Sequence, residues 1–157
     1  MLEKIKQKEF FDNKGIVNES IKSKKFDQYL ILETGKAGEN YLSFILDKYH
    51  IKYADVTNKN WAHDFELKDQ NLQTISRIQV KATSCIWSGR KRIDCNNYEE
   101  NSFDVICIVS LKQSKCLFIS GQESYYSISM SMFENHENDW EFHTLEKVIN
   151  KKIFIET

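Results

Sequence analysis

The chain has 157 residues, the usual size of a single domain and enough to bury a hydrophobic core. Hydrophobic residues make up 41% and aromatic residues 13% of it, which excludes a disordered protein. Lys and Arg total 22 against 23 Asp and Glu, so the net charge of −1 gives no overall signal for a nucleic-acid partner.

The chain is predicted to be a single domain, 1–157, that begins with a lysine-rich segment. Residues 1–34 combine lysines with scattered apolar residues, which predicts an N-terminal arm of one or two amphipathic helices. The arm would be a packing or dimer contact, or would lie along phosphates. Residues 35–121 are predicted to form the core of the domain, and 122–157 a C-terminal extension.

A helix is predicted from Gly38 to Tyr49, with Thr34 and Gly35 as its start signals. Glu39 falls on the apolar side of this helix, so its carboxylate is expected to point inward and to need a partner. The alternative is a first-turn glutamate stabilised by the helix dipole. The apolar stripe recurs at helical spacing and consists of Leu42, Ile45, Leu46 and Tyr49.

Strands are predicted over 51–56, 64–67 and 76–84, and the polar stretch 68–75 predicts that the last two form a hairpin. From residue 77 to 83 apolar and polar residues alternate, so Gln79 and Lys81 share one face. If the hairpin is antiparallel, Asp64 lies close to both. A carboxylate, an amide and an ammonium would then converge on one spot.

The rest of the chain predicts a loop over 85–100 and an interior strand, covered on both faces, over 103–109. A further strand is predicted at 116–119, and a short helix at 127–133. A closing helix at 145–149 and a short strand at 153–155 complete the pattern. This order predicts an α/β (α+β) fold, with a central mixed β-sheet of about five strands flanked by helices.

Four residues would form one chemical site if the helix packs across the sheet: Glu39, Asp64, Gln79 and Lys81. Two carboxylates balance a divalent cation, and the Gln79 amide oxygen and Val80 backbone carbonyl can complete the oxygen shell that magnesium prefers. Lys81 would steady a phosphate oxygen and help to orient or deprotonate a water molecule. These parts indicate phosphodiester hydrolysis.

At these residues the sequence resembles the PD-(D/E)xK nuclease superfamily, the fold of restriction endonucleases and Holliday-junction resolvases. Glu39 matches the helix glutamate, Asp64 the strand aspartate, and Gln79-Val80-Lys81 the (D/E)-x-K element. The Gln-x-Lys variant is similar to that of group I intron homing endonucleases. The resemblance covers about residues 35–121. His63 stands in place of the usual proline, and Gln79 removes one negative charge, which is expected to weaken metal binding unless Glu39 compensates.

The resemblance implies a restriction endonuclease-like core and a metal-dependent hydrolase that cuts double-stranded or branched DNA, with Mg²⁺ as cofactor and Mn²⁺ as a substitute. Asp64, Glu39, Gln79 and the Val80 carbonyl would be metal ligands, and Lys81 the catalytic lysine. Cutting both strands of a duplex suggests a homodimer or a higher oligomer. The residues expected to contact nucleic acid are Arg77, Thr83, Ser84, Arg90, Lys91 and Arg92.

Two alternatives stay open. The first is a catalytically inactive nuclease-fold protein that binds nucleic acid, which the amide of Gln79 favours. The second is a toxin or defence nuclease that acts on RNA or on branched DNA.

The remaining patterns give weaker expectations. The four cysteines and four histidines lack the spacing of a zinc site, and Cys107 is expected to be a buried hydrophobe. Trp87 is interpreted as a packing residue in preference to a base-stacking one. With no signal peptide and no apolar stretch of membrane-spanning length, we expect a cytoplasmic protein with free thiols and no membrane partner.

Overall fold

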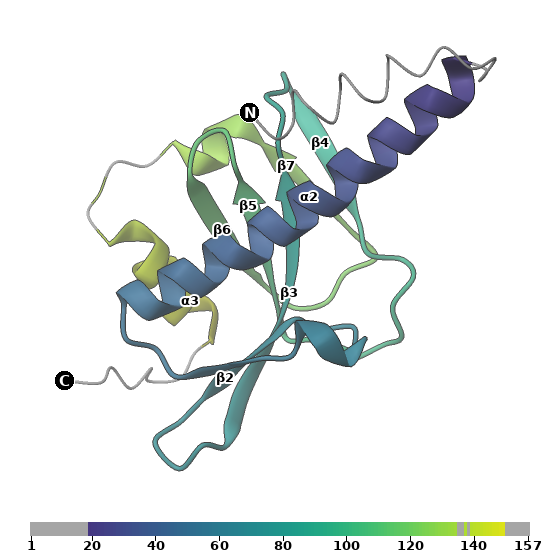
Figure 1. Ribbon diagram of the computed structural model, residues 1–157. Helices are drawn as coiled ribbons and strands as arrows, with labels where there is room; N and C mark the ends of the chain where they lie inside the picture. Colours follow the sequence, from purple (N-terminus) through teal and green to yellow (C-terminus); the bar gives the residue numbers. More distant parts are fainter. Residues whose placement is uncertain (1–18, 135–136, 138, 150–157) are drawn as a thin grey trace. The chain divides into compact units, whose positions relative to one another are not determined.

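The computed structural model describes residues 19–134, 137 and 139–149 (Figure 1). The chain divides into two units, 1–33 and 34–157, and helix α2 (Glu19–Lys48) crosses the boundary between them. The strand predicted at 153–155 and most of the predicted N-terminal arm lie outside the described residues. Among the helices of the described ranges, none is both long and apolar enough to cross a bilayer.

The main sheet has five strands, which confirms the predicted mixed sheet. Its order is β1 (Tyr53–Asp55), β2 (Phe65–Lys68), β3 (Thr74–Thr83), β5 (Val105–Ser110) and β6 (Lys115–Ser120). The strands β3 and β5 are parallel, and every other neighbouring pair is antiparallel. All six residues of β5 are buried, so the prediction of an interior strand is confirmed.

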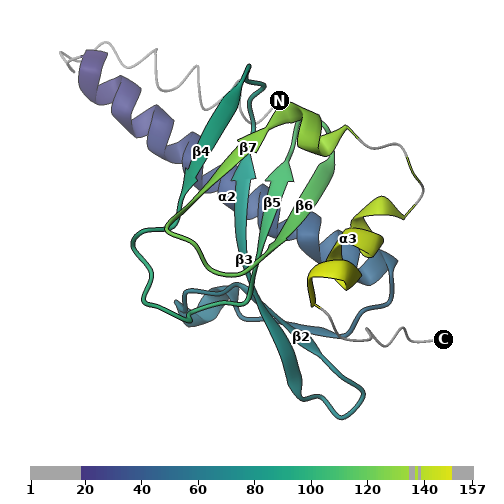
Figure 2. The same cartoon turned by 180° about the vertical axis from the view of Figure 1, so that it is seen from behind.

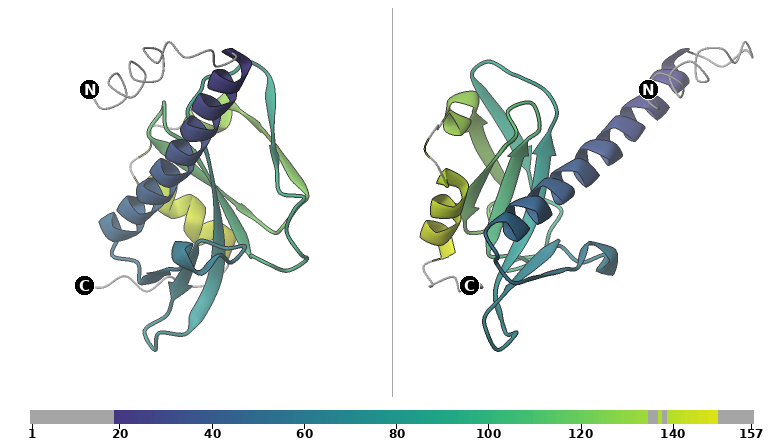
Figure 3. Two further views of the ribbon diagram at one scale, coloured as in Figure 1. Left: turned by 45° about the vertical axis from the view of Figure 1, so that its right-hand side comes forward. Right: turned by 60° about the vertical axis from the view of Figure 1, so that its left-hand side comes forward.

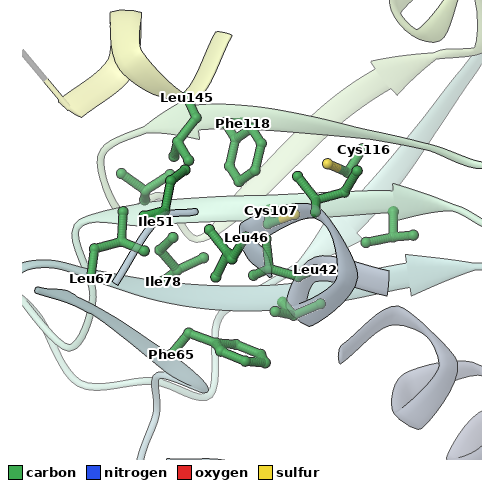
Figure 4. Close-up of a cluster of buried hydrophobic side chains, with 14 residues drawn as sticks. Leu42, Leu46, Ile51, Phe65, Leu67, Ile78, Cys107, Cys116, Phe118 and Leu145 are labelled. Carbon is green, nitrogen blue, oxygen red and sulfur yellow. The ribbon is translucent and has the colours of Figure 1, made fainter. Parts of the chain in front are cut away.

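Two helical segments cover one face of this sheet. The part of α2 from Thr34 onward and α3 (Trp140–Ile149) contribute Leu42, Leu46 and Leu145 to a core that also contains Ile78 and other strand residues (Figures 1 and 4). The predicted apolar stripe is confirmed, since Leu42, Ile45 and Leu46 are buried.

The predicted helix start at Thr34 and Gly35 is wrong, because α2 runs through both residues without a break. A glycine inside a helix weakens it by only about 1 kcal/mol, which neighbouring helix-forming residues and packing on the sheet offset. The predicted closing helix is confirmed, and it begins earlier than expected, at Trp140.

A second, two-stranded sheet covers the other face. It pairs β4 (Arg90–Asp94) with β7 (Tyr125–Ser129), and it packs over Ile106 and Ile108 of β5 (Figures 2 and 3). Trp87 lies edge-on to Phe133 in this core, with ring centroids 6.4 Å apart, and its indole N–H donates to the Ile128 carbonyl. The interpretation of Trp87 as a packing residue is confirmed.

Two local predictions are wrong at this sheet. The segment 85–100 contains strand β4 where a loop was predicted. The segment 127–133 is the end of β7 followed by a 3₁₀ helix, η2 (Met130–Phe133), where one helix was predicted. Both strands owe their pairing to a partner more than 30 residues away, so neither carries a hairpin signal in its own sequence.

Candidate functional site

The site begins where β2 ends its pairing with β3. Phe65 faces Ile78 across the hairpin, and the Asp64 amide donates to the Ile78 carbonyl at 2.8 Å. Two residues further along β3, the Val80 amide donates to the Asp64 side-chain oxygen Oδ2 at 2.8 Å instead of to a main-chain carbonyl. The edge of β3 therefore opens at Val80, and the Asp64 carboxylate occupies the opening. The predicted antiparallel hairpin is confirmed.

Gln79 and Lys81 lie on the sheet face that meets β4 and β7. They stand in register with Ile106 and Ile108, which belong to the core on that face. The Gln79 amide nitrogen Nε2 donates to the Val80 carbonyl at 3.0 Å. The ammonium of Lys81 donates to the Tyr98 hydroxyl at 3.0 Å and lies 5.1 Å from the centroid of its ring. The prediction that Gln79 and Lys81 share a face is confirmed.

Glu39 lies on α2, which packs on the opposite face of the sheet. The preceding residue, Gly38, allows the helix backbone to approach β3 closely. A Cβ atom built on Gly38 would lie 2.5 Å from the Cβ of Ala82, which is closer than two carbon atoms can pack. The backbone of α2 therefore touches β3 beside the site. Glu39, the next residue, is half-buried at the margin of the apolar stripe, and its carboxylate accepts from Lys36 at 3.4 Å.

Electrostatics couple these groups. Burial raises the pKa of Asp64 to about 6, and the negative charge of Glu39 adds to the rise. The Val80 amide, Lys81 and His63 oppose the shift without cancelling it. The Asp64 carboxylate therefore carries a negative charge that its surroundings do not fully compensate, and a bound cation would compensate it.

The available donor atoms suit a hard cation. Within the described ranges no three His, Cys, Asp or Glu side chains converge as a metal-binding group, so a cation here would depend on two carboxylates and neutral oxygens. Asp64, and Glu39 whose charge raises the Asp64 pKa, would be these carboxylates. The Gln79 amide uses its nitrogen on the Val80 carbonyl, which leaves its own oxygen free of any donor among the described residues. Carboxylate, amide and carbonyl oxygens are the ligands of Mg²⁺ and Mn²⁺.

The predicted nucleic-acid contacts fall into separate groups. Arg77 forms a two-point ion pair with Asp104, in which Nε and Nη2 each lie 3.1 Å from a carboxylate oxygen. Along β4 the side chains alternate between exposed and partly buried. Arg90 and Arg92 are exposed, and Arg92 pairs with Asp94 at 2.6 Å, whereas Lys91 is half-buried.

Lys91 connects β4 to the end of β3. Its ammonium donates to the Thr83 hydroxyl at 3.1 Å and lies 3.2 Å from the Cys85 sulfur. Thr83 is buried and Ser84 is exposed, so of these two residues Ser84 offers its hydroxyl to the surface. Arg90, Arg92 and Ser84 are thus the accessible members of the predicted set.

Sequence reasoning did not assign the partner of Lys81. Tyr98 lies 17 residues further on, in a segment that pattern analysis reads only as loop, and no local signal links the two. The close contact of Gly38 with Ala82 was also missed, although here a local signal exists. A glycine on the sheet-facing side of a predicted helix was the available sign, because it permits close approach.

The comparisons with known proteins add one similar structure. The chain matches no protein-family model and no curated protein. It is similar to the solved structure of a bacterial homing endonuclease, I-Ssp6803I, with a TM-score of 0.46 and 11% identity over 71% of this chain and 85% of that chain.

Proposed function

We propose that this protein is a metal-dependent endonuclease that hydrolyses DNA phosphodiester bonds. The observation that supports this best is the hydrogen bond between the Val80 amide and the Asp64 carboxylate. It ties Asp64 to the strand that carries Gln79 and Lys81, while the pKa of Asp64 responds to Glu39 and Lys81. Two acids, an amide and an ammonium, with Glu39 on the helix side of β3 and Gln79 and Lys81 on its other face, would supply the groups that phosphodiester hydrolysis requires.

Asp64 and Glu39 would hold a Mg²⁺ ion, and the Gln79 amide oxygen and the Val80 carbonyl would be its neutral ligands. The ion would supply Lewis-acid polarisation of the phosphodiester. The protein's part is to fix the ligands before substrate arrives. The Val80 amide orients Asp64 at 2.8 Å, and the contact of Gly38 with Ala82 fixes the helix turn that bears Glu39.

Lys81 is proposed to act on the substrate directly. Its ammonium makes no ion pair with a described carboxylate, and it donates to the Tyr98 hydroxyl, which holds it in place. An ammonium that is positioned without being neutralised can donate to a phosphate oxygen as negative charge develops there, and can orient the attacking water. Arg90, Arg92 and Ser84 would contact the DNA backbone, and a homodimer would present two such sites to a duplex.

A panel of substrates tests this function. Supercoiled plasmid, single-stranded DNA, a four-way junction and transfer RNA are each incubated with the full-length protein in Mg²⁺, in Mn²⁺ and in EDTA. We expect metal-dependent cutting of one or more DNA substrates and none in EDTA. Cutting that persists in EDTA, or cutting of transfer RNA alone, contradicts a metal-dependent DNA endonuclease.

One observation favours a second candidate, a nucleic-acid-binding protein without turnover. Gln79 replaces an acid, and its amide nitrogen occupies the Val80 carbonyl that would be a ligand. Isothermal titration of Mn²⁺ into the wild type and Asp64→Ala separates the two. Heat of binding that disappears in Asp64→Ala supports the nuclease, whereas the absence of binding to the wild type, together with intact plasmid, supports the binding protein.

A further inference from the structure

A surface cleft of about 700 Å³ lies beside the proposed catalytic centre. One wall is the segment from Asn60 to His63, and the other is formed by residues 97–99 and Ser102. Two residues that line the cleft connect it to the catalytic centre. His63 precedes Asp64 directly in the chain, and Tyr98, which lines the cleft, binds the ammonium of Lys81. A group in this cleft would therefore sit next to the bond that the centre cuts.

An exposed tryptophan, Trp61, lines the cleft. Trp61 is 53% exposed, although a side chain of this kind normally contributes to a core. One face of its ring stacks on His63, with centroids 5.3 Å apart and planes 29° from parallel. About half of the Trp61 surface stays exposed beside this stack, and Trp61 lines the cleft, so the ring has free surface on which a flat ligand can stack.

A series of contacts fixes the position of the His63 ring on which Trp61 stacks. His63 is buried, and its Nε2 lies 3.0 Å from the Glu66 carboxylate. Glu66 in turn pairs with Lys68 at 2.8 Å. The support under Trp61 is therefore fixed by the folded hairpin, which reduces the entropy lost when a ligand stacks on it.

The polar lining favours a neutral, flat ligand over a phosphate. Glu66 and Glu99 line the cleft and would repel an anion, whereas Asn60 and Asn97 offer amide groups that both donate and accept. Among the described residues, the basic side chains proposed for phosphate contact do not line it. A nucleobase combines an aromatic face with hydrogen-bonding edges, and stacking of bases on aromatic side chains is the common mode of single-strand recognition.

We infer that this cleft binds one unpaired nucleobase of the DNA substrate, stacked on Trp61, beside the phosphodiester that is cut. The inference rests on the proposed function and makes it more specific. The substrate class would be DNA that presents a base outside a duplex stack, such as a bulge, a branch or a single strand. Fully paired DNA would have to release a base first, at a cost of unstacking.

The test measures DNA binding without cleavage. Fluorescence anisotropy in EDTA compares two labelled duplexes that differ only at a one-nucleotide bulge, which carries either adenine or an abasic residue. The full-length wild type is compared with Trp61→Ala, with Trp61→Phe and with the control Leu72→Ala, which removes an exposed side chain in the connection between β2 and β3. Circular dichroism and thermal melting verify that each variant is folded.

We expect the wild type and Leu72→Ala to bind the adenine bulge about tenfold more tightly than the abasic bulge. Trp61→Ala should lose this preference, and Trp61→Phe should retain most of it. Equal affinity of the wild type for both bulges, or a preference that survives in Trp61→Ala, overturns the inference. A preference for the adenine bulge without metal-dependent cutting of any DNA substrate in the panel supports the base-binding cleft and contradicts the nuclease. Cutting of DNA without this preference supports the nuclease and overturns the inference. Absence of DNA binding by the wild type also overturns the inference, and the cutting panel then decides on the nuclease separately.

Discussion

The main-chain amide of Val80 donates a hydrogen bond to the carboxylate of Asp64 at the point where β2 and β3 part. A strand edge that opens must satisfy its amides, and here a side chain does so. The same carboxylate lies close enough to Glu39 and Lys81 for its pKa to respond to both. One hydrogen bond thus serves the fold and places an acid within the candidate site.

Asp64→Asn should stabilise the protein at pH 8 in EDTA. The pKa of Asp64 rises from 3.8 to about 6, so the stability linked to its protonated form is complete below pH 4 and lost as the pH rises through 6. Asparagine can still accept the Val80 amide and carries no charge. We expect a gain of about 1–2 kcal/mol in the free energy of unfolding at pH 8, and none at pH 4.

Urea unfolding at the two pH values measures this gain. The matched control is Asp94→Asn, which removes a carboxylate from an exposed pair with Arg92 and should leave stability nearly unchanged, because solvent screens such pairs. If Asp64→Asn is less stable than the wild type at pH 8, the folded protein itself compensates the charge of Asp64. The site would then not need a cation.

Gly38→Ala should disturb both stability and cutting. The added Cβ meets Ala82 at 2.5 Å, so the helix must move away from β3 and carry Glu39 with it. Overpacking of this kind costs about 1–3 kcal/mol. Gly35→Ala is the matched control, because its Cβ meets nothing within 4 Å and alanine favours the helix by up to about 1 kcal/mol. Urea unfolding and plasmid nicking of both variants check this, and equal behaviour of the two contradicts the close contact.

The sequence predicted the centre of this site better than its surroundings. Alternation from Arg77 to Thr83 predicts which side chains share a face, and the polar stretch 68–75 predicts the hairpin. Asp64, Gln79 and Lys81 could therefore be placed near one another from local patterns. Strand β4 could not be found this way, because its exposed face is basic and its partner β7 is distant in the chain. Contacts such as Lys81 with Tyr98 depend on packing between loops, which no periodicity encodes.

Acid should destabilise the hairpin through Glu66. Lys68 and then His63 lower the pKa of Glu66 to about 2 from 4.5, so its stabilising charge is complete above pH 4.5 and lost as the pH falls toward 2. We expect Glu66→Gln to remove up to about 1 kcal/mol of stability at pH 6 and to equal the wild type near pH 2. Unfolding free energies across this range measure it, and a constant difference at every pH contradicts the assignment.

Substitutions of the basic residues should show that some of them bind DNA and others stabilise the fold. Arg90 is exposed, and its Nη1 donates to the Ser127 carbonyl, so its charge is free for a phosphate. Arg90→Ala should lower DNA affinity and reduce the slope of log affinity against log salt by about 0.9. Arg77→Ala breaks the two-point pair with Asp104 and should lower stability instead.

Anisotropy titrations between 50 and 200 mM salt, with melting curves for both variants, check this separation. If Arg77→Ala melts like the wild type but reduces the slope of log affinity against log salt, Arg77 contacts DNA. Its assignment as a residue that stabilises the fold would then be wrong.

The most direct test of the proposed centre is the rate at which Lys81→Ala nicks supercoiled plasmid in Mg²⁺, under single-turnover conditions and at protein concentrations that saturate the DNA. Lys81 is held by Tyr98 and has no described carboxylate partner, so its removal should leave folding and DNA affinity near wild type. We predict a nicking rate at least about 100-fold lower than that of the wild type. A variant that nicks at the wild-type rate would contradict the catalytic site proposed here.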